Sequence, residues 1–174
     1  MTLARSLALL GALAALAIAS SASAADKDAG ATPFKTDALY KAFHGKEGIN
    51  RVVDTLVDLS VADPRISEIF KGQDIPHLRQ MLDEQFCYLL DGPCTYTGKD
   101  MKEGHKDLGI QQTDFNALVE NLQKAMDKEG VPFRDQNRFL AKLAPMERVV
   151  VQRSGAPKLL FQAGQASACK PWTL

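Results

Sequence analysis

Apolar residues recur at steps of three and four along most of this chain, the spacing that places them on one face of an α-helix. The first such segment runs from Leu39 to Leu59, and Asp63-Pro64 ends it because the residue before a proline disfavours helical backbone angles. A single short turn follows at 65–70, before a break at Lys71-Gly72. The pattern up to residue 72 therefore predicts one long helix and one helical turn.

A second amphipathic helix is predicted from Asp74, a residue type favoured at the N-cap, to about Leu90. Asp91-Gly92-Pro93 ends it. Its inner face, at the spacing i, i+3, i+4, i+7, i+8 and i+11, carries Leu78, Met81, Leu82, Gln85, Phe86 and Leu89. This face is apolar apart from a single glutamine.

The rest of the chain also has a helical pattern. A loop over 91–99 precedes a short helix at 100–106; Thr113 is expected to cap a helix to about Glu129, and a last helix spans roughly 134–152 with a bend at Pro145. The positions predicted to face inward are Phe115, Leu118, Val119, Leu122 and Met126 in the first long helix and Phe139, Leu140, Leu143, Met146 and Val150 in the second. No alternating strand pattern of useful length appears, so the predicted fold class is all-α.

The beginning of the chain has a different composition. Residues 1–24 contain one charge, Arg5, then 14 apolar or small residues from Ser6 to Ala19, and small residues with an Ala-x-Ala pattern at 22–24. This order is typical of a cleavable secretory signal. The alternative is a membrane anchor, but 14 helical residues span roughly 21 Å, less than the ~30 Å bilayer core. We expect cleavage before Ala25 and a periplasmic or secreted protein that is free of the membrane.

Four segments follow from these patterns. They are a signal peptide at 1–24, a flexible leader at 25–37, a helical domain at 38–152 and a loosely ordered tail at 153–174. Export would place the three cysteines, at positions 87, 94 and 169, where disulfides persist. A Cys94–Cys169 bridge would hold the tail, but the sequence leaves all three pairings open.

Composition excludes classes of function without naming one. The chain has 174 residues, with 45% hydrophobic and 24% charged residues, which argues against a mainly disordered protein. Lys+Arg and Asp+Glu are both 21, so bulk charge gives no case for nucleic-acid binding. Histidine occurs only at 44, 77 and 105, and no nucleophile–His–acid motif stands out. A lone histidine is more often a surface or core residue than a ligand, so spacing alone does not favour a site.

Several sequence strings change that judgement. Leu39–Val151 resembles a group I truncated haemoglobin, a family of small bacterial-type globins. The most specific string is Tyr96-Thr97-Gly98 followed by Met101 and His105 with Gly109-Ile110. The other matching pieces are Leu39-Tyr40, Gly48-Ile49, Ala62-Asp63-Pro64-Arg65, Ile69-Phe70-Lys71-Gly72-Gln73-Asp74, Gly92-Pro93, Gly130-Val131-Pro132 and Leu143-Ala144-Pro145.

The resemblance implies a two-over-two helical sandwich around haem b. His105 matches the proximal iron ligand, and neutral imidazole is a normal haem ligand. Phe70 matches the aromatic residue that packs on the haem. The implied haem-contacting set is Phe70, Leu78, Arg79, Leu82, Met101, His105 and Phe115, and the implied distal pocket consists of Val57, Leu78, Met81, Leu82 and Gln85. Arg79 is included as a partner for a haem carboxylate, although it would equally serve as an ordinary solvated charge.

The distal positions depart from the family pattern. Members that hold oxygen tightly resemble one another in a distal Tyr and Gln pair, and this chain has Val57 and Leu82 there. A donor hydrogen bond to oxygen is worth roughly 1–3 kcal/mol in a dry pocket. Gln85 is the remaining candidate donor, or else a partly exposed residue at the helix end. We therefore expect weak oxygen retention and a reduced preference for O₂ over CO.

Met81 suggests a second ligand. We hypothesise that it binds the iron opposite His105 in at least one oxidation state, because His/Met is the axial pair of cytochromes. The alternative role for Met81 is an apolar wall of the pocket. If Met81 binds the iron at rest, the iron is six-coordinate, and otherwise it is five-coordinate. The sequence leaves this coordination number open.

Three functions follow from the resemblance. The first is reversible binding of O₂, NO or CO, including oxygen transport; the second is electron transfer or redox sensing with His/Met ligation. The third is enzymatic, as an NO dioxygenase, which would need an external electron donor because no reductase domain is visible. We expect a monomer with no catalytic residues of its own and no nucleic-acid partner.

Overall fold

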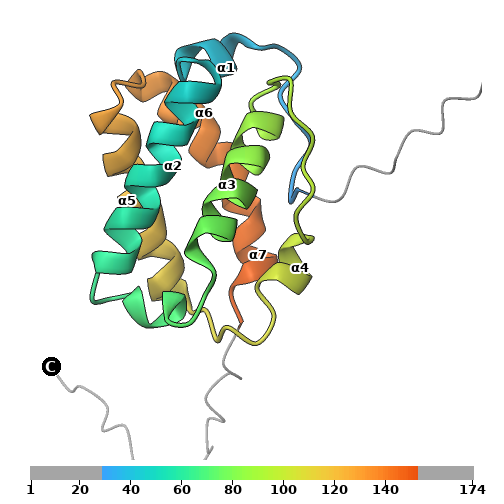
Figure 1. The fold of residues 1–174 in the computed structure, drawn as a ribbon. Helices are drawn as coiled ribbons and strands as arrows, with labels where there is room; N and C mark the ends of the chain where they lie inside the picture. Colours follow the sequence, from blue (N-terminus) through green and yellow to red (C-terminus); the bar gives the residue numbers. More distant parts are fainter. Residues whose placement is uncertain (1–28, 153–174) are drawn as a thin grey trace, which may run out of the picture.

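The computed structural model describes residues 29–152, and every regular element in that range is helical (Figure 1). The elements are α1 (Ala38–Ala42), α2 (Gly45–Ala62), η1 (Ser67–Phe70), α3 (Ile75–Leu89), α4 (Met101–Gly104), α5 (Gln112–Lys128), α6 (Phe133–Leu143), η2 (Ala144–Met146) and α7 (Glu147–Val150). The expected signal at 1–24 and tail at 153–174 lie outside the described residues. No helix between residues 29 and 152 is long and apolar enough to cross a bilayer.

The four longest of these helices form two pairs. α2 packs on α3 and α5 packs on α6, while α2 also packs along α5 and so joins the pairs (Figure 1). The side of α2 towards its neighbours is fully apolar at Val52, Val53, Leu56 and Val57, all buried. Phe139 of α6 closes the core, edge-to-face against two other phenylalanine rings. The expected all-α, two-over-two arrangement is confirmed.

The first predicted helix is broken in two. α1 ends at Ala42, and His44 and Gly45 then take left-handed backbone angles, with φ of 60° and 69°. A Cβ atom at Gly48 would overlap the carbonyl oxygen of Phe43, so a residue without a side chain is needed at this corner. The apolar residues resume at Ile49, six positions after Phe43, so the pattern of apolar residues on both sides of the break predicted one continuous helix.

Other boundaries agree more closely. Asp74 caps α3 as predicted, since its carboxylate accepts a hydrogen bond from the His77 backbone at 3.1 Å. The predicted cap of α5 is wrong: Gln111 and not Thr113 precedes the helix, and Thr113 lies inside its first turn. The Asp114 carboxylate accepts from the backbone nitrogen of Gln111 at 2.9 Å. At Pro145 the last helix passes through the 3₁₀ turn η2, the predicted interruption.

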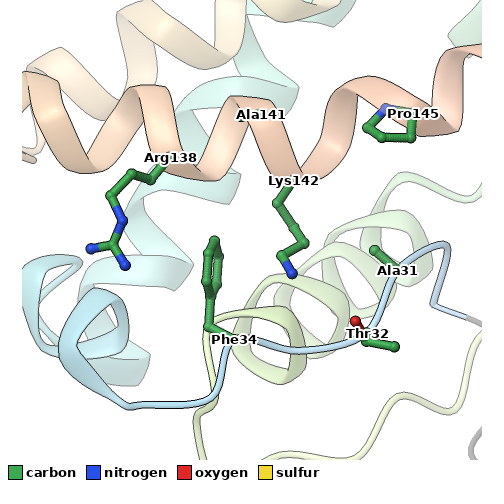
Figure 2. A pocket seen from close by; sticks show the side chains of 7 residues that line it. All are labelled: Ala31, Thr32, Phe34, Arg138, Ala141, Lys142 and Pro145. Atoms are coloured by element: carbon green, nitrogen blue, oxygen red, sulfur yellow. The ribbon is translucent and has the colours of Figure 1, made fainter.

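Residues 29–37, the larger part of the segment expected to be a flexible leader, are packed against the helices. Ala29 is 2% exposed, and the backbone nitrogen of Phe34 donates to the carbonyl of Leu89 at 2.9 Å. The Phe34 ring lies between Lys142 and Arg138 of α6, with their charged groups 4.4 Å and 5.6 Å from its centre (Figure 2). This segment therefore covers the end of α3 and one side of α6.

A disulfide fastens the loop between α3 and α4. Cys87, near the end of α3, bonds Cys94, with 5.8 Å between their Cα atoms. The Glu84 carboxylate also accepts from the backbone and hydroxyl of Thr97, at 2.9 Å and 2.6 Å. The loop that leads to α4 is thus held to α3 at two points. Cys169 lies outside the described residues.

Candidate functional site

His105 ends α4 and has a defined ring orientation. Asp100 caps this short helix by accepting from the Glu103 backbone at 2.9 Å, and the buried Met101 anchors it. The His105 ring is half-buried, with Nδ1 2.7 Å from the carbonyl oxygen of Met101. A carbonyl can only accept, so Nδ1 is the donor in this contact, and in a neutral ring of this tautomer Nε2 keeps its lone pair. Neutral imidazole with one nitrogen fixed by hydrogen bonding is the usual form of a metal-binding histidine.

The predicted distal face of α3 is turned towards α4. Gln85 is 6% exposed, and its side-chain nitrogen donates to the Ala29 carbonyl at 2.8 Å and lies 3.3 Å from the Met101 sulfur. Leu78 and Met81 precede Gln85 by two turns and one turn on the same face of the helix. Because Gln85 contacts the helix that ends at His105, this face and the histidine are on adjoining elements.

The molecule has one apolar end that is not closed by its own side chains. In α3 the buried residues begin at Gln85 and in α5 they begin at Ala117, whereas the first turn of each helix has none. Leu118 shows this clearly, since it lies on the same face as the buried residues Asn121 and Leu122, three and four positions later, but is 36% exposed. We call this region the open apolar end; its half-buried or exposed members are Phe70, Leu78, Met81, Leu82, Leu108, Phe115 and Leu118. Figure 1 shows the starts of α3 and α5 and the loop after α4 at the same end of the molecule.

These features fit a flat apolar prosthetic group. Within residues 29–152 the Nε2 atom of His105 forms no hydrogen bond, and large apolar side chains from four separate segments remain partly exposed at the same end. A haem would cover such side chains and take the free ring nitrogen as an iron ligand. The donor set and its surroundings therefore suit the group that the resemblance implies.

The implied site residues lie in different environments. Val57, at 2% exposed, is part of the wall that α2 presents to its neighbours. Met101 is buried, and Leu82 and Phe115 pack on the core while keeping part of their surface exposed. Gln85 is buried rather than partly exposed at the helix end, and its nitrogen already has a protein acceptor.

Arg79 is turned to α2, where it bridges two carboxylates. Its guanidinium contacts Asp54 at 2.8 Å and Asp58 at 2.6 Å, and donates to the Asp54 carbonyl at 2.9 Å. Two acidic residues one turn apart on α2 match the two arms of the guanidinium, so this intramolecular pairing competes with any haem carboxylate. At the same helix crossing, burial and the nearby Asp54 raise the pKa of Asp83 to about 6.

The other two histidines have structural surroundings. His44 Nδ1 lies 3.3 Å from Glu129 Oε1, beside the ion pair of that carboxylate with Arg51. His77 is exposed in the first turn of α3. His77 directly precedes Leu78 and so lies beside the open apolar end, but it is exposed to solvent, and the structure gives neither histidine a contact with the residues of that end.

The structure also has surface hollows apart from this site. One of about 520 Å³ lies between the N-terminal segment and α6, with Phe34, Arg138 and Lys142 in its lining (Figure 2). A smaller one of about 100 Å³ lies beside Gly30, Met101 and Met146. N-terminal residues line both hollows, Phe34 in the larger and Gly30 in the smaller. The sequence did not predict this, because nothing local in 29–37 signals packing on α4 or α6.

Comparison with known proteins agrees with the fold. The family model described as bacterial-like globin matches residues 38–159, more than half of the chain. A group 1 truncated haemoglobin of Tetrahymena pyriformis is 31% identical over 97 residues, covering 56% of this chain and 80% of that protein. A group 1 truncated haemoglobin of Mycolicibacterium paratuberculosis is 31% identical over 108 residues, covering 62% and 79%.

Solved structures give the same grouping. The crystal structure of the Tetrahymena pyriformis protein in its Fe(III) form has a TM-score of 0.63 and 26% identity, and covers 66% of this chain and 98% of that one. A group II truncated haemoglobin of Bacillus anthracis, with a TM-score of 0.59, 23% identity and coverage of 66% and 90%, shares the fold. The family model and these relatives together show that the chain belongs to the bacterial-like globins as a group 1 truncated haemoglobin, a globin-type haem protein.

Proposed function

We propose that this protein binds haem b at the open apolar end, with His105 as the proximal iron ligand, and binds O₂, NO or CO reversibly on the opposite side. The observation that carries the proposal is the pairing of a histidine whose Nε2 is unbonded with large apolar side chains left partly exposed at the same end. Bound haem would supply an iron centre for a diatomic gas; the chain supplies the ligand, the cover and the exclusion of water.

The residues divide this work between them. The Met101 carbonyl fixes the His105 ring, and Phe70, Leu82 and Phe115 supply apolar surface for the two sides of a flat group. On the distal side, Val57 offers no hydrogen-bond donor, and the Gln85 nitrogen is engaged by Ala29. A gas that depends on donor hydrogen bonds, as O₂ does, gains little there, so the pocket favours CO relative to O₂.

The proposal predicts that replacement of His105 removes the iron ligand but leaves the pocket. His105→Gly should lose the visible spectrum of histidine-ligated haem, and added imidazole should restore it by entering the space of the deleted ring. His77→Gln is the matched control and should bind haem and CO as the wild type does, because His77 is exposed on α3. Visible spectra of the purified proteins, oxidised and reduced, with and without CO, measure this; a wild-type protein that takes up no haemin would refute the proposal.

A second candidate function is electron transfer or redox sensing with Met81 as the sixth ligand. It is favoured by the face that Met81 occupies, one turn before the Gln85 that contacts Met101. Met81→Leu should then change the oxidised or reduced spectrum and lower the reduction potential, since Met ligation raises it. Met126→Leu, in the buried core of α5, is the control. Identical spectra of wild type and Met81→Leu in both oxidation states would leave Met81 as a pocket wall.

The proposal includes the cellular setting. Export through the predicted signal at 1–24 is supported by the Cys87–Cys94 disulfide, a bond that persists in oxidising compartments. N-terminal sequencing of the exported protein should begin at Ala25. Any turnover as an NO dioxygenase would take electrons from an external donor, and steady-state NO consumption with and without a reductant measures it.

A further inference from the structure

Gln152, the last described residue, makes three hydrogen bonds to the segment from His105 to Ile110. Its side-chain nitrogen donates to the His105 carbonyl at 2.9 Å, and its side-chain oxygen accepts from the Gly109 backbone at 3.0 Å. Its own backbone nitrogen donates to the Ile110 carbonyl at 2.8 Å. A single residue, two positions after the end of α7, therefore holds both ends of the 105–110 loop.

Apart from Gln152, the loop is anchored at its far end by Ile110, which is 7% exposed in the core, and within itself by the Leu108 backbone nitrogen, which donates to the His105 carbonyl at 3.4 Å. α4 has only four residues, too few to be stable alone, and His105 is its C-terminal cap residue. Asp107 and Gly109 then take left-handed backbone angles, with φ of 63° and 65°. A Cβ at Gly109 would touch nothing, so only the backbone angle favours glycine there. The chain at His105 is thus short, sharply turned and dependent on tertiary contacts.

We propose that Gln152 is a positioning residue for His105, which sets where the imidazole lies relative to the helices of the core. The inference rests on the proposed function, in which that imidazole ligates haem iron. The ring is restrained through Nδ1 by the Met101 carbonyl, and the backbone of the same residue is restrained by Gln152. The two restraints act on different atoms, and both are needed because the first lies within α4 and moves with it.

The carboxamide is the group that these contacts select. It carries a donor and an acceptor side by side, and the loop offers a carbonyl and an N–H to match. Gln152→Glu keeps the acceptor for Gly109 but sets an oxygen against the His105 carbonyl, whereas Gln152→Leu removes both bonds. The two variants therefore separate the bond to His105 from the bond to Gly109.

The test compares these variants with Gln112→Glu and Gln112→Leu. The Gln112 amide donates to Asn116 on the surface of α5, so its loss should have no effect at His105. In the haem-free protein, amide hydrogen exchange at Gly109 should be roughly fivefold faster in Gln152→Leu, as for loss of one ordinary hydrogen bond, and unchanged in Gln152→Glu.

In the haem-loaded protein, both Gln152 variants should shift or broaden the iron–histidine stretching band in resonance Raman spectra. They should also release haem to an acceptor globin roughly tenfold faster, as for loss of an orienting partner of a metal ligand.

The outcomes are separable. The positioning role would be overturned if both Gln152 variants had the same haem-release rate and the same iron–histidine band as the Gln112 controls. Unchanged amide exchange at Gly109 in Gln152→Leu would also overturn it. Should Gln152→Leu fail to fold, Gln152→Glu still decides the point through the band and the release rate. A wild-type protein that binds no haem would refute the proposed function, and the Gly109 exchange of the haem-free protein would still report the contact itself.

Discussion

At the scale of single residues, Gln85 connects three parts of the chain that the sequence keeps far apart. Its nitrogen donates to Ala29 and lies against the sulfur of Met101, and Met101 in turn accepts from His105. The glutamine that the pattern singled out as the one polar group on an apolar face is therefore occupied by contacts within the protein. A buried amide is costly to leave unpaired, which explains its position beside a backbone carbonyl that no helix satisfies.

Gln85→Leu should lower the free energy of unfolding of the haem-free protein by about 1–2 kcal/mol, because the buried Ala29 carbonyl loses its donor. The same change should alter the O₂ dissociation rate of the haem-loaded protein little, since the amide is not directed to the gas. Urea denaturation and stopped-flow O₂ release measure the two effects. Gln80→Leu, which removes an exposed amide on the same helix, is the control. A large acceleration of O₂ release with unchanged stability would contradict this role.

At the scale of elements, α3 and the loop after it act as one unit. The helix is buried in its second half, and the disulfide and the Glu84–Thr97 bonds attach the loop to that half. The loop ends at Asp100, the cap of α4. The position of His105 thus depends on the buried end of α3 as well as on α7.

Reduction of the disulfide should loosen this unit. The disulfide joins residues that are 7 positions apart, and in the chain-entropy description closing such a loop contributes about 2–3 kcal/mol to the free energy of unfolding. The double variant Cys87→Ala/Cys94→Ala should therefore unfold at a lower urea concentration than the oxidised protein. Amide exchange at Thr97 should rise, because its acceptor Glu84 would no longer be held opposite. Cys169→Ser is the control and should match the wild type. Equal urea midpoints for the oxidised, reduced and doubly substituted proteins would count against a structural role for this bond.

At the scale of the whole molecule, both ends of the described chain reach the same site. Ala29 accepts from Gln85 on the distal helix, and Gln152 donates to the carbonyl of His105. The N-terminal segment also covers the end of α3 through the Phe34–Leu89 backbone bond. Segments outside the four long helices therefore decide how firmly the site is built.

Stability should depend on pH through two carboxyls with opposite shifts. Burial and the charge of Asp54 raise the pKa of Asp83 to about 6. The positive charges of Lys46 and Arg79 act in the opposite direction but do not cancel this rise. The folded state then binds this proton more tightly than the unfolded chain, whose Asp pKa is about 3.9, so stability falls as pH rises from about 4 to 6. Hydrogen bonds from Arg65 hold the pKa of Asp63 well below its ordinary value, so that contribution is present above about pH 4 and is lost in acid.

Asp83→Asn should therefore be more stable than the wild type at pH 7.5 and equal to it near pH 4, where Asp83 is already neutral. Melting temperatures of the haem-free proteins across this range measure the difference. Asp91→Asn, at an exposed left-handed position that Asn tolerates, is the control and should show no such dependence. A constant difference between Asp83→Asn and wild type at all pH values would contradict the assignment.

The helices themselves could be predicted because their signals are local. Asp74 caps α3, Gly92 and Pro93 follow its end, and Pro145 interrupts the last helix, each through its own backbone chemistry. The break at His44 was missed because apolar residues at helical spacing lie on both sides of it, and the pattern was interpreted as one helix across the six-residue step from Phe43 to Ile49. The disulfide partner of Cys87 was left open for a similar reason, since only the fold brings its Cα within 5.8 Å of that of Cys94.

The sequence by itself determined the helical class and the family, and it singled out the histidine that we propose as the iron ligand. Helix spacing, caps and the strings from Tyr96 to Ile110 are contiguous along the chain, so they can be recognised without the fold. Only the tertiary structure decided how the polar groups are used. Gln85 is committed to Ala29, Arg79 to Asp54 and Asp58, and Gln152 to the His105 loop, across separations of 21 to 56 residues. Hydrogen bonds and ion pairs act over about 3 Å, so their partners follow from the packing of helices and not from the order of residues.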